Sequence, residues 1–189
     1  MTDELTPHQK GREIAKFREK FRHEKIHELT KNDFEDFLKA CPKLFATRTA
    51  KPDARHEDMH GGLVLATFPE TKKALEILVD ETSRSLHERL EEINSDAVKF
   101  KRKKHFKSAI FSPILWLINP EEYAIFDRTV EIMLKQKYHA EFDSNDWQTY
   151  EKANIKLKEI AKEQGCSLYE LDQKTENEFG NKPAEKSSP

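Results

Sequence analysis

The stretch best suited to contact phosphate is a basic run from Lys99 to Lys107, which reads Lys-Phe-Lys-Arg-Lys-Lys-His-Phe-Lys and contains no acid. Lys and Arg displace the counterions that condense on a nucleic-acid backbone, and interleaved Phe rings can stack on bases. The run therefore predicts DNA contacts through its basic side chains: Lys99, Lys101, Arg102, Lys103, Lys104, His105 and Lys107. The alternative interpretation is a solvated, lysine-rich helix face. A less dense basic stretch, His8 to Lys25, has the same two interpretations.

The sequence His-Glu-Asp-Met-His at 56–60 matches the HExxH motif of zinc hydrolases. On a helix, His56 and His60 would hold the metal one turn apart, with Glu57 as the general base. The aspartate inside the motif places a charge where such helices are normally uncharged, and Gly61 would end the helix at once. No third ligand is evident. We therefore expect no metal and no cofactor, and keep the zinc hydrolase as the weakest alternative.

A longer pattern begins at Lys107-Ser108-Ala109, continues through an apolar helix, and reaches Asn119-Pro120-x-x-Tyr-Ala-Ile-Phe-Asp127-Arg-x-Val. It resembles the central part of the helix-hairpin-helix DNA glycosylase superfamily. In that superfamily a basic hairpin precedes a Ser/Thr-Ala helix, and a catalytic aspartate caps the next helix close to twenty residues after the lysine. Here Lys107 and Asp127 are twenty residues apart. The run is also similar to helical modules of modified-DNA restriction and phage defence, and the resemblance covers Phe100 to Lys135.

The resemblance implies excision or sensing of a modified base, with DNA as the partner. Asp127 would be the carboxylate that stabilises positive charge on the sugar, and Lys107 would attack the sugar carbon. Trp116, Tyr123 and Phe126 would form the walls of a pocket for the flipped base. From the residues alone, the alternatives are that Asp127 is a plain helix N-cap and that Lys107 is a solvated or phosphate-facing lysine.

The chain departs from the superfamily at the hairpin. Glycines at that place let backbone amides approach a phosphate closely. In this chain the position holds Lys103, Lys104 and His105, so phosphate contact would fall to side chains.

The elements that must position these residues are predicted to be helices. Thr67 and Glu70 form a capping-box pattern before apolar residues at spacings of three and four, which predicts one helix from about Pro69 to Asn94. The stretch from Ser108 to Ile118 is apolar on nearly every side, which is typical of a central core helix.

Other helix boundaries follow from capping residues. A basic N-terminal helix is predicted over about 7–29, beginning at Thr6 and Pro7. Capping patterns also occur at Thr30 with Asp33 and at Ser167 with Glu170. One further helix would begin at Ser144 or Asn145 and end at Gly165.

The composition excludes several classes of protein. No window holds the ~18 consecutive apolar residues that a membrane span needs, and the polar start does not read as a signal peptide. Two separated cysteines among 189 residues form neither a disulfide scaffold nor a cysteine metal site. Five glycines against 12 phenylalanines, with 36% charged residues, favour helices. We expect a cytoplasmic all-α protein with one compact, glycosylase-like domain of about eight helices over 1–179 and a disordered tail over 180–189.

The charge is unevenly distributed along the chain. The net charge of -2 is the sum of -5 over residues 119–189, with 10 basic and 15 acidic residues, and +3 over residues 1–118, with 23 basic and 20 acidic residues. DNA is therefore not excluded, but its binding surface must be local. The acidic part supports a second hypothesis, a non-catalytic interaction or accessory module with a protein partner. A small-molecule substrate is not expected, and whether the protein is an enzyme stays open.

Overall fold

The computed structural model describes residues 5–45, 65–95 and 107–180, and all the regular structure in these ranges is helical. The all-α class and the number of about eight helices are therefore confirmed. The elements are α1 (Pro7–Lys20), a 3-10 turn η1 (Ile26–Glu28), α2 (Lys31–Leu44), α4 (Phe68–Val79), α5 (Leu86–Asn94), α6 (Ser108–Ile118), α7 (Arg128–Tyr138), α8 (Trp147–Glu163) and α9 (Leu168–Phe179).

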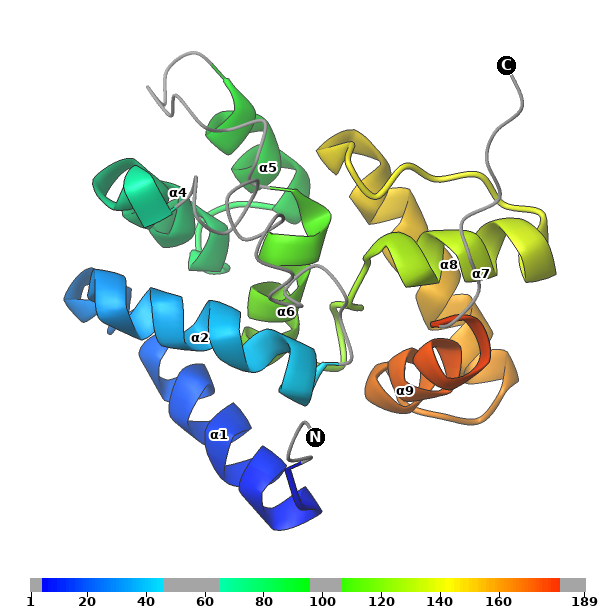
Figure 1. Ribbon diagram of the computed structural model, residues 1–189. Coiled ribbons are helices and arrows are strands. Elements are labelled where there is room, and N and C mark those ends of the chain that lie inside the picture. The colour runs from blue at the N-terminus through cyan, green and yellow to red at the C-terminus, as the bar shows by residue number, and fades with distance from the viewer. Residues whose placement is uncertain (1–4, 46–64, 96–106, 181–189) are drawn as a thin grey trace.

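The centre of the molecule is α6, as its apolar sequence predicts. Nine of its 11 residues are buried, and Pro113 lies inside the helix without ending it. Figure 1 shows α6 between α1, α2, α4 and α5 on one side and α7, α8 and α9 on the other. One buried apolar cluster includes residues from each of the eight α-helices in the described parts of the chain, so these helices share a single core.

The N-terminal basic helix is shorter than the predicted 7–29. It begins at the Thr6 cap as expected, but ends at Lys20, and the chain turns before η1. Ile26 follows Phe17 by nine residues, about two and a half helical turns, so a continuous helix would place it on the opposite face. The turn brings Phe17, Phe21 and Ile26 into the same core, where all three are buried.

The single helix predicted over 69–94 is wrong, because the chain forms two helices there. Thr67 is the N-cap of α4, although its side chain accepts no capping hydrogen bond. The Asp80 carboxylate accepts hydrogen bonds from Thr82 Oγ1 at 2.8 Å and Ser83 Oγ at 2.6 Å, which stabilises a turn. A capping box between Ser85 and Glu88 then starts α5.

The start of α8 also differs from the prediction, since its N-cap is Asp146. The predicted caps have other roles. Ser144 donates to Glu131 Oε2 through its backbone N–H at 3.0 Å and its hydroxyl at 2.7 Å, and the Asn145 N–H donates to Asp143 Oδ1 at 2.8 Å. The predicted end is confirmed, because Gly165 adopts a positive φ of 61° directly after the helix.

Two further expectations meet the limits of the described ranges. The tail predicted over 180–189 lies outside them except for Gly180. Within them, none of the helices has the length and apolar character to span a bilayer.

Candidate functional site

Asp127 lies at the N-cap of α7 and is only 3% exposed. Its Oδ1 accepts the backbone N–H groups of Thr129 at 2.9 Å and Val130 at 3.1 Å. The N-terminus of a helix carries partial positive charge, which favours the ionised carboxylate. The N-cap role of Asp127 is therefore confirmed, while a catalytic role stays a prediction.

A second carboxyl group, that of Asp172 on α9, lies close enough to Asp127 to interact with its charge. Asp172 is 7% exposed, and the Gln173 side-chain amide donates to its Oδ2 at 3.2 Å. Burial raises the pKa of Asp172 well above its ordinary value, and the negative charge of Asp127 raises it further. Asp127, a carboxylate at a helix N-terminus, thus lies near a second buried carboxyl group whose pKa is raised.

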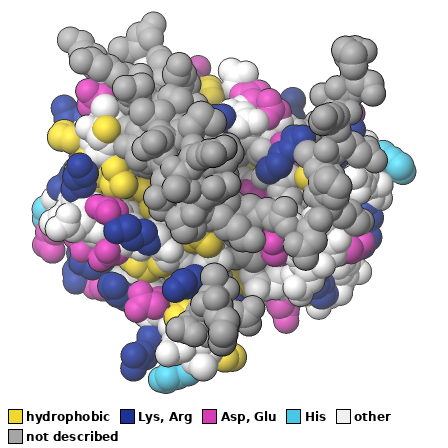
Figure 2. Space-filling model, in the orientation of Figure 1, with side chains coloured by type: hydrophobic (Ala, Val, Ile, Leu, Met, Phe, Trp, Pro, Cys, Tyr) yellow, Lys and Arg dark blue, Asp and Glu magenta, His cyan; other side chains and the backbone are white. Residues whose placement is uncertain are grey.

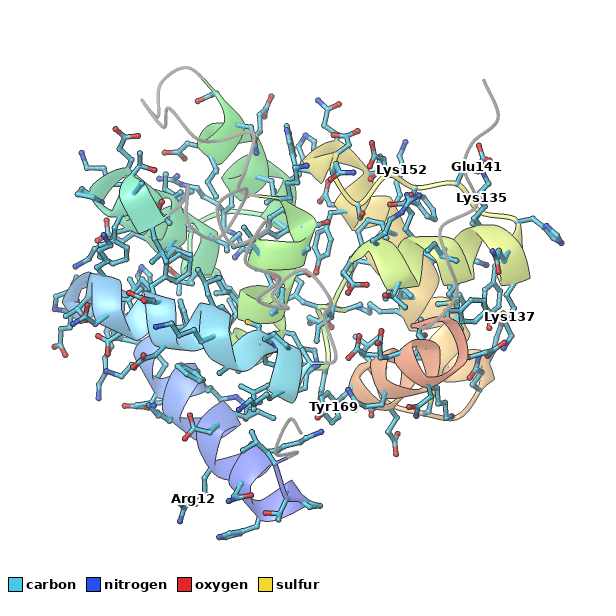
Figure 3. All side chains as sticks on the ribbon, in the orientation of Figure 1. Arg12, Lys135, Lys137, Glu141, Lys152 and Tyr169 are labelled. Atoms are coloured by element: carbon cyan, nitrogen blue, oxygen red, sulfur yellow. The ribbon has the colours of Figure 1, made fainter. Side chains whose placement is uncertain are left out.

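Tyr169 lies near Asp172 and packs against Trp116. The ring of Tyr169 lies 5.1 Å from that of Trp116, and its hydroxyl donates to the Leu44 carbonyl at 3.1 Å. Burial raises the pKa of Tyr169, and the charge of Asp172 raises it further, which places the side chain of Tyr169 near Asp172. In Figure 3, Tyr169 lies where the end of α2 approaches α9.

The indole Nε1 of Trp116 is buried and has no hydrogen-bond partner within the described ranges. An unsatisfied buried N–H is rare in proteins and calls for an explanation. We call Trp116, Asp127, Tyr169 and Asp172 the carboxyl cluster. It combines two buried carboxyl groups, a tyrosine hydroxyl and an indole N–H that has no hydrogen-bond partner within the described ranges.

The segment before α7 positions Asp127 through hydrogen bonds from other helices. The Asn154 amide oxygen accepts the N–H of Ala124 at 2.7 Å, and the Tyr150 hydroxyl donates to the carbonyl of Ala124 at 2.8 Å. The Ser112 hydroxyl accepts the N–H of Phe126 at 2.9 Å. The irregular backbone is therefore fixed by side chains of α6 and α8.

The position of Asp172 in the carboxyl cluster depends on the packing of α9 against α7. The buried face of α9 consists of Leu168, Leu171, Asp172, Thr175 and Phe179. A capping box between Ser167 and Glu170 fixes where this helix begins, as predicted. Asp172 is not among the predicted site residues. The sequence does carry a signal for it, since an acid four residues after Leu168 falls within the apolar stripe of the helix.

Lys107 lies apart from the hydrogen bonds of the carboxyl cluster just described. It is the N-cap residue of α6, and its Nζ donates to Asn145 Oδ1 at 2.7 Å. The Ser108 hydroxyl donates to the Ser144 carbonyl, which ties the same end of α6 to the loop before α8. The remaining residues of the predicted DNA contact (Lys99, Lys101, Arg102, Lys103, Lys104 and His105) lie outside the described ranges, as do His56, Glu57 and His60.

The three aromatic residues predicted to line a base pocket have different surroundings. Trp116 belongs to the carboxyl cluster, whereas Phe126 is fully buried in the core with its ring 6.4 Å from that of Tyr150. Tyr123 accepts a hydrogen bond from Arg89 Nη2 at 2.8 Å and faces a surface groove. Within the described ranges, no ring contact joins any two of the three.

That surface groove follows α8 and has a volume of about 850 Å³. We call it the α8 groove. Its walls come from α5, the turn at 120–123, α8 and the start of α9. Ile155, which is 59% exposed, lies in it and was missed from the sequence. The signal was its position on α8, out of phase with the buried stripe of Tyr150, Leu157 and Ile160.

The described ranges hold no group of three or more His, Cys, Asp or Glu side chains that could bind a metal ion. Comparison with known proteins found no matching family model, no matching curated protein and no matching solved structure.

Proposed function

We propose that the protein associates with DNA and acts there as a glycosylase-like protein that excises or senses a modified base, with Asp127 as its central carboxylate. The observation that supports this proposal is the buried pair of Asp127 and Asp172, at the place where the sequence resemblance puts a catalytic aspartate. Two adjacent buried carboxyl groups destabilise a fold, and strongly perturbed acids concentrate at functional sites.

The two carboxyl groups suit the two halves of N-glycosidic bond cleavage. The electron pair of the breaking bond stays with the base nitrogen, and Asp172 can supply the proton that this nitrogen takes up. Asp127 can stabilise the positive charge on the sugar and accept a proton from the water that adds to it. Because the two groups are 3% and 7% exposed, the proposal requires the carboxyl cluster to open when a base enters.

DNA contact is assigned to the run from Lys99 to Lys107 rather than to α1. Most cations on and just after α1 form ion pairs within the chain: Lys16 with Glu13, Lys20 with Asp33, and Arg22 and Lys25 with Glu19. Figure 2 shows basic and acidic side chains intermixed on the face that carries α1 and α2. A mixed surface attracts a polyanion less than a run of cations without acids.

Charge reversal tests the DNA contact. The double variant Lys103→Glu with Lys104→Glu should lose duplex binding, and wild-type affinity should fall steeply with salt because binding releases counterions. The matched control reverses two exposed cations of α1, Arg12→Glu and Lys16→Glu, and should bind nearly as well as wild type. Electrophoretic mobility measurements on plain and base-modified duplexes at two salt concentrations separate these outcomes. Salt-independent binding, or equal losses in both variants, would contradict the proposal.

Replacement of the central carboxylate tests the chemistry. Asp127→Asn keeps an oxygen that can cap α7, so DNA binding should persist, while base excision should fall by about 100-fold or more. The readout is strand cleavage at the abasic site in duplexes that carry mismatched or modified bases. If wild type only senses a base, Asp127→Asn should instead remove its preference for modified over plain duplex. Unchanged excision and unchanged preference would leave Asp127 as a cap alone.

A further inference from the structure

The α8 groove is an apolar recess on the surface of the protein. Its apolar lining includes Leu86, Tyr123 and Ile155, and Ile155 is the single large hydrophobic side chain that the described ranges leave exposed. An exposed apolar recess with a polar rim is typical of an interaction site.

The dimensions of the α8 groove suit a helix. Its lining residues on α8 extend from Glu151 to Lys162, which is three helical turns or about 16 Å. An amphipathic helix that lies in such a groove contacts it through apolar residues spaced three and four apart. The α8 groove is too open to enclose most of the surface of a small ligand, as small-molecule sites do.

The walls of the groove are held in place by hydrogen bonds. Arg89 donates to the Tyr123 hydroxyl at 2.8 Å, and the Asn154 side-chain amide donates to the Glu122 carbonyl at 2.9 Å. Both bonds involve side chains that are at least partly buried. A preformed surface loses little conformational entropy when a partner binds.

The charge on the rim indicates the character of the partner. The lining contains four glutamates and two lysines: Glu121, Glu122, Glu151, Glu159, Lys158 and Lys162. Three of these glutamates already have partners: Glu122 pairs with Lys158 at 2.7 Å, Glu159 with Lys156 at 3.1 Å, and Glu151 bonds to His87 at 2.8 Å. With Lys156 counted, four acidic and three basic side chains give a net charge of -1, which favours cationic flanks on the occupant of the groove.

We infer that the α8 groove docks an amphipathic helix of a protein partner, whose apolar stripe covers Tyr123 and Ile155 and whose Lys or Arg residues face the acidic rim. This inference concerns a different surface from the carboxyl cluster and does not depend on the proposed action on DNA.

A small label on Cys166 can report on the α8 groove, which this cysteine lines. The other cysteine, Cys41, is buried, and burial raises the pKa of its thiol, so a thiol reagent should select Cys166. A trifluoroethyl group on Cys166 can be followed by fluorine NMR during titration of the full chain. The probes are two peptides of about 18 residues, a length that permits helix formation, with identical leucine stripes flanked by lysine or by glutamate.

The lysine-flanked peptide should shift the Cys166 signal and bind at least about tenfold more tightly than the glutamate-flanked peptide, and this difference should shrink in high salt. Ile155→Ser should weaken the lysine-flanked peptide by about tenfold, because it removes exposed apolar surface without disturbing the core. The control Lys152→Ser, on the same helix but outside the groove lining, should bind like wild type.

Three results would overturn the inference. The first is equal binding of the two peptides, and the second is full binding by Ile155→Ser. The third is self-association of wild type in sedimentation experiments that Ile155→Ser abolishes, because the groove would then be occupied by a second copy of the chain.

Discussion

At the scale of single residues, Asp172 gives the clearest expectation. Its pKa is raised in the folded state, so the folded protein keeps a proton that the unfolded chain releases above about pH 4. The stability that this group contributes is therefore complete below about pH 4 and is lost as the pH rises toward the folded-state pKa.

Asp172→Asn should therefore stabilise the protein at pH 8, by about 1 kcal/mol or more, with the gain vanishing near pH 4. Asn resembles the protonated carboxyl group and cannot acquire the buried charge. Urea denaturation at pH 4, 6 and 8 measures the effect. Glu178→Gln, a half-exposed acid on the same helix, is the control and should differ little from wild type at any of these pH values. A gain that does not depend on pH would contradict the assigned charge state.

The carboxyl cluster shows which roles of single residues can be predicted from the sequence and which cannot. Asp127 was predicted as a helix N-cap because an acid before a new apolar pattern is a strong local signal. The partnership with Asp172 was not predicted, because the two residues lie 45 positions apart and meet only through the packing of α9 on α7. Likewise, the sequence alone does not show that Trp116, Tyr123 and Phe126 have different surroundings, since all three are aromatic residues in one stretch.

At the scale of elements, the break between α4 and α5 depends on Arg89, which is 1% exposed. Its guanidinium donates to the Leu78 carbonyl at 2.5 Å and the Ser85 carbonyl at 3.4 Å, and also to the Tyr123 hydroxyl. One side chain thus joins the end of α4, the start of α5 and the 120–123 turn.

Arg89→Met retains most of the side-chain volume but leaves buried oxygens without donors. We expect a loss of about 3 kcal/mol in the free energy of unfolding. Urea denaturation measures it, and Arg84→Met is the matched control, because Arg84 forms an exposed ion pair with Glu92. The control should change stability by less than about 0.5 kcal/mol. Equal losses in the free energy of unfolding of the two variants would show that the buried hydrogen bonds of Arg89 do not stabilise the protein more than an exposed ion pair does.

The helix boundaries show which local signals decide an element. The capping patterns predicted at Thr30 and Ser167 both occur as capping boxes. The helix start predicted at Thr6 from the following proline is confirmed, and its capping box with Gln9 was not predicted. The break at 80–85 was not predicted, because the apolar spacing continues through it. Ser85 and Glu88 form a capping box inside that apolar pattern, where the spacing gives no sign that a second helix begins. Periodicity therefore identifies the buried face better than it identifies the ends of a helix.

At the scale of the whole molecule, the single core predicts cooperative unfolding. Trp116 lies in the buried core on α6, and the same apolar cluster reaches every α-helix of the described ranges. In the variant Trp147→Phe, fluorescence reports on Trp116 alone. Its denaturation curve should coincide with that of the helical circular dichroism signal, as two-state unfolding requires. Two separated transitions would instead divide the described helices into independent units.

In the folded molecule, the two basic stretches of the sequence differ in how much of their charge is known to be paired. The sequence carries its excess positive charge mainly in two stretches, His8 to Lys25 and Lys99 to Lys107. In the structure, most cations of the first stretch are paired with neighbouring acids. This could not be predicted from counts, because the pairing of Lys20 with Asp33 depends on the turn that brings α2 beside α1.

The segment at 119–127 also bears on how the protein can be engineered. Its backbone bonds to the side chains of Ser112, Tyr150 and Asn154, which belong to rigid helices. A reporter or epitope inserted there would move these backbone groups away from partners that cannot follow. Although the segment looks like an ordinary connecting loop, its length is fixed by the spacing between α6 and α8, which makes it a poor place to extend the chain.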